Sequence, residues 1–307
     1  MSTATVIDSS SIVEKTVFLS TSYGMMGNSK KVSNSVINGA ANTRILKIQK
    51  SLLDSKELEA IRTADGKMRN YLYNVCLPFD TGIQLLPLEL LESVYDRLTA
   101  YSDERNELVN AFCTAYPTLC VEAQTELQKL AVEIGVPYES LYNPADYPSV
   151  EMVRAKFTFE FRCRSFAVPD ALKKTAFYDA EKTKAQAQIE NAANEITYIM
   201  RQTMLDLINH LKSALEPSTD GKPKRLFASS VTNIQDFLDT FKARNITNDA
   251  ELDALVSDVS KIIHPNFAVD VLKKDDSLKN TVHETMESVA SKLSSLVETV
   301  PGRKFKK

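Results

Sequence analysis

Apolar residues recur at steps of three and four along most of the chain, which is the spacing of one face of an α-helix. The longest run without proline or glycine covers residues 170–216, and within it residues 178–215 are expected to form one helix. Eight apolar residues of this run follow the helical spacing: Ile189, Ala193, Ile196, Met200, Met204, Leu207, Leu211 and Leu215. A helix of that length extends about 57 Å. We therefore predict one helix that is longer than a compact domain of this size needs.

The same spacing predicts helices on both sides of the long one. They are expected over residues 43–75, 88–115, 118–134, 231–243, 248–263 and 276–298. Pro117 separates two of them, because an internal proline removes a backbone donor and clashes with the preceding turn. We therefore expect the helix to kink or stop at Tyr116. The polar, proline-containing segment 217–223 is the best domain boundary in the chain.

Residues 157–164 carry the clearest strand pattern, because apolar and polar side chains alternate throughout. One face carries phenylalanines and a cysteine, and the other carries Glu160, Arg162 and Arg164. A single strand leaves its backbone unpaired, so it needs a partner, and the β-branched and aromatic run at 16–22 is the best candidate. Two alternatives stay open: pairing with another subunit, and a helix, since apolar residues here also repeat at four.

These elements predict a mainly α fold, an elongated helical bundle with one long helix and a small two-stranded β element. Residues 1–42 are expected to form an N-terminal arm and a short strand. Residues 43–216 are expected to form a helical core, with the β element near 157–164 and the long helix at about 178–215. Residues 224–307 are expected to form a small C-terminal helical bundle.

Composition is that of an ordinary globular protein. Hydrophobic residues make up 43% and charged residues 25% of the 307 positions, which argues against wholesale disorder. The formal charge of -3 gives no reason to expect nucleic acid or an anionic membrane as the main partner. No segment approaches the ~18 apolar residues of a membrane span, and no secretory signal pattern is present. The cytoplasm is therefore the expected location.

We predict no catalytic, cofactor-binding or metal site. The three histidines, His210, His264 and His283, do not stand three or four positions from one another or from a cysteine, so zinc spacing is absent. The four cysteines are scattered and are expected to be free thiols in a reducing compartment. The segment 24–30 contains two glycines and ends in lysine, but its spacing is wrong for a phosphate-binding loop.

A rigid loop rich in proline and tyrosine covers residues 142–149, just before the predicted strand. The loop and the polar face of the strand form a candidate interaction surface: Tyr142, Asp146, Tyr147, Glu160, Arg162 and Arg164. Two other functions use some of these residues. One is an enzyme of unrecognised type, built on the loop with Glu160 and Arg162. The other is nucleic-acid binding through the two arginines and the basic segment 303–307.

Several short motifs follow one another between residues 86 and 169. They are Leu86-Pro87, ERNELVNAFCTAYP at 104–117, LYNPADYP at 141–148, FTFEFR at 157–162 and Val168-Pro169. In this order they resemble a family of bacterial and phage proteins that is catalogued as a domain of unknown function. Members of that family are often associated with MoxR-type AAA+ ATPases and von Willebrand A-domain proteins.

The resemblance implies a non-enzymatic adaptor or scaffold, an accessory partner of such an ATPase system in the cytoplasm of a bacterial host cell. A phage member would instead be an accessory protein or serve in the structure or assembly of the particle. The family carries no assigned catalytic residues. The long helix and the strand without an assured partner additionally suggest a homo-oligomer.

Overall fold

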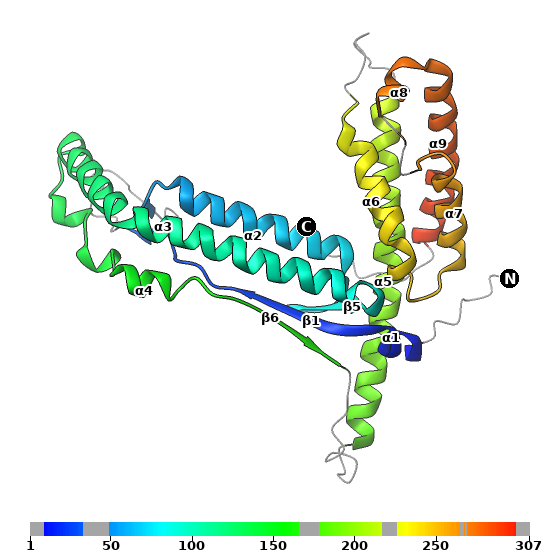
Figure 1. The fold of residues 1–307 in the computed structure, drawn as a ribbon, viewed down its shortest axis with the longest axis horizontal. Coiled ribbons are helices and arrows are strands. Elements are labelled where there is room, and N and C mark those ends of the chain that lie inside the picture. Colours follow the sequence, from blue (N-terminus) through cyan, green and yellow to red (C-terminus); the bar gives the residue numbers. More distant parts are fainter. Residues whose placement is uncertain are drawn as a thin grey trace, which may run out of the picture. The chain divides into compact units, whose positions relative to one another are not determined.

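The computed structural model describes residues 9–32, 49–165, 178–216, 226–264, 267 and 269–298. The chain is mostly helical and carries a small antiparallel sheet (Figure 1), which confirms the predicted fold class at that level. It divides into two compact units. The first unit comprises Met1–Ser20, Tyr73–Glu92 and Cys163–Lys307, and the second comprises Thr21–Leu72 and Ser93–Arg162.

The first unit is built on the long helix α5, Tyr178–Leu215, whose predicted position is confirmed. Its helices α6 (Ala228–Arg244) and α9 (Asp276–Glu298) pack along α5 (Figure 1), and α7 (Ala250–Ser260) and α8 (Val269–Lys274) pack against α9. The apolar faces meet in one core, which includes Ile196, Met204, Phe241, Met286 and Leu293. The helical spacing seen in the sequence therefore marks the buried face of each helix.

Two further parts of the first unit come from far earlier in the chain. Residues 9–15, expected as part of an arm, form the short helix α1, Ser9–Lys15, and Ile12 is fully buried in the α5 core. Strands β4 (Leu77–Asp80) and β5 (Ile83–Pro87) add Leu77 and Leu85 to the same core.

The sheet has four strands in the order β4-β5-β1-β6, where β1 is Thr16–Tyr23 and β6 is Phe159–Arg164. The neighbouring positions of β1 and β6 agree with the predicted pairing. The expected two-stranded element is nevertheless too small, because β5 pairs antiparallel with the other edge of β1, Thr16 opposite Pro87. Pro78 lies on the edge strand β4, where a missing backbone donor is tolerated.

The second unit is built on α2, Lys56–Val75, and α3, Leu91–Ile134. Of the two outcomes expected at Tyr116, a kink or a stop, the stop does not occur, because one helix of 44 residues runs through Pro117. Phe112, Cys113 and Tyr116 are buried just before the proline, and this packing offsets the lost hydrogen bond. A two-stranded sheet, β2 (Ser29–Lys31) with β3 (Gln49–Ser51), replaces part of the helix predicted over 43–75.

Candidate functional site

The loop predicted as an interaction surface begins where α3 ends. Gly135 has a φ of 67°, a left-handed conformation that favours glycine, and its amide donates to the Val132 carbonyl while the Val136 amide donates to that of Ala131. These two bonds form a Schellman motif, which satisfies carbonyl groups at the helix end. Residues 138–149 follow, and we call them the tyrosine loop.

Local hydrogen bonds fix the shape of the tyrosine loop. It contains two turns of 3-10 helix, Tyr138–Ser140 and Pro144–Asp146, and the Asn143 side chain accepts a bond of 3.0 Å from the Ala145 amide. Ser149 caps the next helix, α4 (Val150–Arg154), by accepting a bond from the Met152 amide. The loop is therefore held in one conformation by its own side chains.

Three tyrosine rings stack on one another in the tyrosine loop. The Tyr138 and Tyr142 ring centroids are 5.1 Å apart with an interplanar angle of 12°, and those of Tyr142 and Tyr147 are 5.4 Å apart at 20°. All three residues are half-buried, and the Tyr138 hydroxyl oxygen is enclosed. Burial, together with the charge of Asp146, raises the pKa of the Tyr147 phenol to about 12. This group therefore stays protonated, and a donor, at neutral pH.

A lysine from β3 anchors the tyrosine loop to the rest of the second unit. Lys50 Nζ lies 2.8 Å from Asp146 Oδ2 and donates to the Leu141 carbonyl at 2.6 Å. Both charged side chains are only 12% exposed, so this pair is shielded from solvent more than a surface pair. The Tyr147 hydroxyl also donates to the Leu52 carbonyl at 3.3 Å. The β3 segment thus holds the loop from one side.

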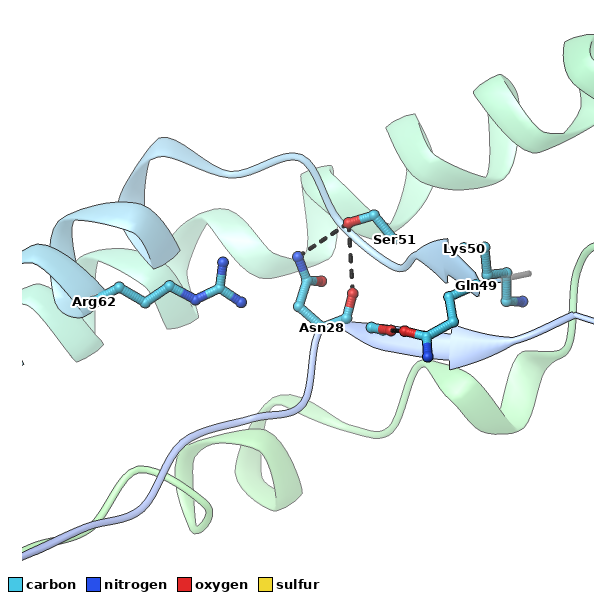
Figure 2. A pocket seen from close by; sticks show the side chains of 6 residues that line it. Asn28, Gln49, Lys50, Ser51 and Arg62 are labelled. Atoms are coloured by element: carbon cyan, nitrogen blue, oxygen red, sulfur yellow. Dashed lines mark hydrogen bonds between the residues drawn. The ribbon is translucent and has the colours of Figure 1, made fainter. Parts of the chain in front are cut away.

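Lys50 also lines an open polar hollow of about 350 Å³ beside the β2–β3 pair (Figure 2). Figure 2 shows the Arg62 side chain extending from α2 toward Asn28. The polar groups of the hollow largely bond to one another: Ser29 Oγ donates to Gln49 Oε1 at 2.6 Å, and Asn28 Nδ2 donates to Ser51 Oγ at 3.2 Å. Arg62 forms an ion pair with Glu59. The hollow is therefore rich in hydrogen-bonding groups, and its arginine charge is offset.

A buried ion pair supports the segment that leads into the hollow. Arg105 Nε donates to Asp65 Oδ1 at 2.8 Å, both side chains are 1% exposed, and the Tyr101 hydroxyl donates to the same carboxylate. Arg105 also donates to the Gly24 carbonyl at 2.7 Å, which fixes the chain just after β1. Burial and the adjacent Asp65 raise the pKa of Tyr101. Sequence reasoning missed this network, although its charged members stand on the apolar faces of two helices.

The structure places the six predicted surface residues in two groups. Tyr142, Asp146 and Tyr147 come together in the tyrosine loop, and Lys50, which sequence reasoning did not identify, joins them. Glu160 and Arg162 lie on β6, where they form an ion pair with each other at 2.9 Å, and Arg164 ends the same strand.

Within the described ranges, no three His, Cys, Asp or Glu side chains gather closely enough to hold a metal ion. Likewise, no helix in the described part of the chain is both long and apolar enough to cross a membrane. Comparison of the chain with models of protein families, with curated proteins and with solved structures finds no match.

Proposed function

We propose that the protein is a non-enzymatic adaptor that binds a protein partner through the tyrosine loop. One observation carries the proposal: the rings of Tyr138, Tyr142 and Tyr147 stack on one another in a loop whose backbone Lys50 bonds at the Leu141 carbonyl. Tyrosine supplies a large, rigid contact area with a polar end, and it is enriched among the residues that dominate binding energy in protein interfaces.

A fixed loop also binds at a lower entropic cost. Ordering a free side chain at an interface costs about 0.5–1.5 kcal/mol, and these three tyrosines are already ordered by stacking. The Lys50–Asp146 ion pair likewise orders the backbone of the loop around these tyrosines. A preorganised aromatic surface beside a polar hollow therefore suits recognition of a folded protein or an extended peptide.

The sequence resemblance suggests which partner to test first. A MoxR-type AAA+ ATPase, with its von Willebrand A-domain protein, is the first class, and a component of a phage particle is the second. Neither class follows from the geometry of the loop, so the experiment must identify the partner without assuming it.

A photo-cross-linking amino acid placed at Tyr142 tests the proposal in cells of the native host. The control carries the same amino acid at Tyr73, a tyrosine on α2 that is 64% exposed and does not belong to the loop. We expect a defined cross-linked protein at position 142 that is absent at 73, and we expect Tyr142→Ala to weaken binding of that protein about tenfold or more. Identical cross-linking patterns at the two positions would contradict the proposal.

The cationic side chains suggest nucleic-acid binding as an alternative function. Lys50, Arg62 and Arg162 each pair with a carboxylate, which reduces the positive potential available to phosphate groups. The basic segment 303–307 lies outside the described residues. Binding of DNA or RNA that weakens steeply as salt rises would favour this alternative over the adaptor.

A further inference from the structure

Strand β6 ends the sheet, and its outer edge is the feature on which this inference rests. In the order β4-β5-β1-β6, the described part of the chain provides no strand on the far side of β6. The strand has neither proline nor lysine, two residues that commonly protect an edge from pairing, and its charged residues are Glu160, Arg162 and Arg164. Its outer edge therefore offers unpaired backbone donors and acceptors to another strand.

One hydrogen bond shows which peptide groups point outward. The amide of Gly24, directly after β1, donates to the carbonyl of Thr158, directly before β6, at 2.7 Å, so this carbonyl points to the β1 side. Because alternate residues of a strand direct their amide and carbonyl to opposite sides, those of Phe159 and Phe161 face away from β1. Phe161 is thus available to exchange two hydrogen bonds with a facing strand.

The charges on β6 are complementary to those of the same strand in reverse. If a second β6 runs antiparallel with Phe161 opposite Phe161, Glu160 of each copy stands opposite Arg162 of the other. A shift of two residues in one direction sets Glu160 against Glu160. A shift in the other direction sets Arg162 against Arg162, with Glu160 opposite Arg164, so only the Phe161-centred register has no like-charge pair. Like charges directly opposite are destabilising, so the Phe161-centred register is the favoured one.

The apolar face of the strand favours the same arrangement. Phe161 makes an edge-on contact with Tyr95 of α3, with ring centroids 5.3 Å apart, and Tyr95 is 53% exposed. Antiparallel pairing about Phe161 would bring this half-covered aromatic pair toward its symmetry mate, while Glu160 and Arg162, each 61% exposed, meet on the other face. A twofold interface of this kind uses the same patch of both subunits.

We propose that two copies of the chain associate through β6, antiparallel and centred on Phe161, so that the Glu160–Arg162 ion pair within each strand is exchanged for two pairs between strands. This inference is independent of the proposed adaptor function, because it involves no residue of the tyrosine loop.

Charge reversal at β6 tests the inference in the full chain. Glu160→Arg leaves two arginines facing two arginines, and Arg162→Glu leaves two glutamates facing two glutamates. Sedimentation velocity should show a wild-type mass twice the 34.3 kDa of one chain and, for each single variant, dimer affinity reduced on the order of 10- to 100-fold. Mixing the two variants should restore a dimer, because the arginine strand then faces the glutamate strand.

Matched controls separate this interface from a general effect of charge. Glu126 and Lys129 form an exposed ion pair on α3, so Glu126→Arg and Lys129→Glu change the net charge by the same amounts. Both control variants should remain dimeric. A wild-type chain that sediments as a monomer at every concentration overturns the proposal, as do single β6 variants that dimerise normally or a mixture that fails to associate.

Discussion

One buried arginine in each unit pairs with a carboxylate. Arg105 pairs with Asp65 in the second unit, and Arg201 Nε lies 2.6 Å from Asp249 Oδ2 in the first. Asp249 additionally accepts from the Leu252 amide and so caps helix α7. Removing one partner of such a pair leaves the other charge buried and unpaired, which costs far more free energy than the loss of a surface ion pair. These residues therefore constrain the packing of the helices that carry them.

Asp65→Asn should lower the free energy of unfolding by about 3–5 kcal/mol, because Arg105 then remains buried without a counter-ion. Urea unfolding followed by circular dichroism measures the loss, since the chain has no tryptophan. Glu59→Gln, on the same helix, breaks only the exposed pair with Arg62 and should cost less than about 1 kcal/mol. Equal losses in the two variants would show that the buried pair has no special role.

Sequence spacing predicts most helices and the two strands with a clear pattern, β1 and β6, but it does not predict the short strands. The bounds of α5 agree with the prediction because its apolar face repeats without an interruption from Ile189 to Leu215 and no proline or glycine precedes it in the helix. Strands β2 and β3 have three residues each and no apolar alternation, so nothing in the sequence distinguishes them from a loop. Strand β4 pairs through a hairpin at Gly82, where φ is 76°. Short strands depend on partners distant in sequence, and such partners leave little local pattern.

The candidate site divides in the same way. The proline and tyrosine content of 142–149 identifies the loop, and Tyr142, Asp146 and Tyr147 lie together in it. Lys50 reaches the Leu141 carbonyl across 91 positions of sequence, and a lone lysine between polar residues carries no sign of that contact. The sequence therefore predicts the loop, but it does not predict the contacts that hold the loop in place.

The close approach of β1 and β6 depends on a glycine. A methyl group at Gly24 would lie 2.3 Å from Thr158 Oγ1 and 2.7 Å from the Lys156 carbonyl oxygen, both far inside van der Waals contact. Gly24→Ala should therefore push the two strands apart and lower the free energy of unfolding by about 1–3 kcal/mol.

Gly27→Ala is the matched control for this prediction, because nothing lies within 4 Å of the added methyl group. It should change the free energy of unfolding by no more than about 0.5 kcal/mol. Urea unfolding compares the two variants, and a Gly24→Ala variant as stable as Gly27→Ala would show that the strands adjust freely.

At the scale of the whole molecule, the two units interleave along the chain. The first unit draws on three separate segments and the second on two. The predicted boundary at 217–223 lies outside the described residues, and the helices after it belong to the same unit as α5, which contributes Ile196, Met204 and Ile208 to their common core. Apolar spacing identifies which face of a helix is buried, but it does not predict which other element packs against that face.

A fragment of residues 226–298 tests whether the C-terminal helices form a bundle by themselves. Without α5, the buried faces of α6 and α9 lose their main packing partner, so the fragment should show low helicity and no cooperative thermal transition by circular dichroism. Extending it to 178–298 restores α5 and should restore a cooperative transition. Cooperative melting of the shorter fragment would instead establish the C-terminal bundle as autonomous.

The interleaving also orders events during synthesis on the ribosome. All of the second unit has been translated once residue 162 is added. In the first unit, Ile12, Leu77 and Leu85 cannot be buried in their core until α5 and the helices beyond it have also been translated. The nascent chain therefore carries an exposed apolar α1 and hairpin while the second unit already folds. Chaperone capture of the nascent protein should concentrate on those two early segments, and it should end when α9 emerges.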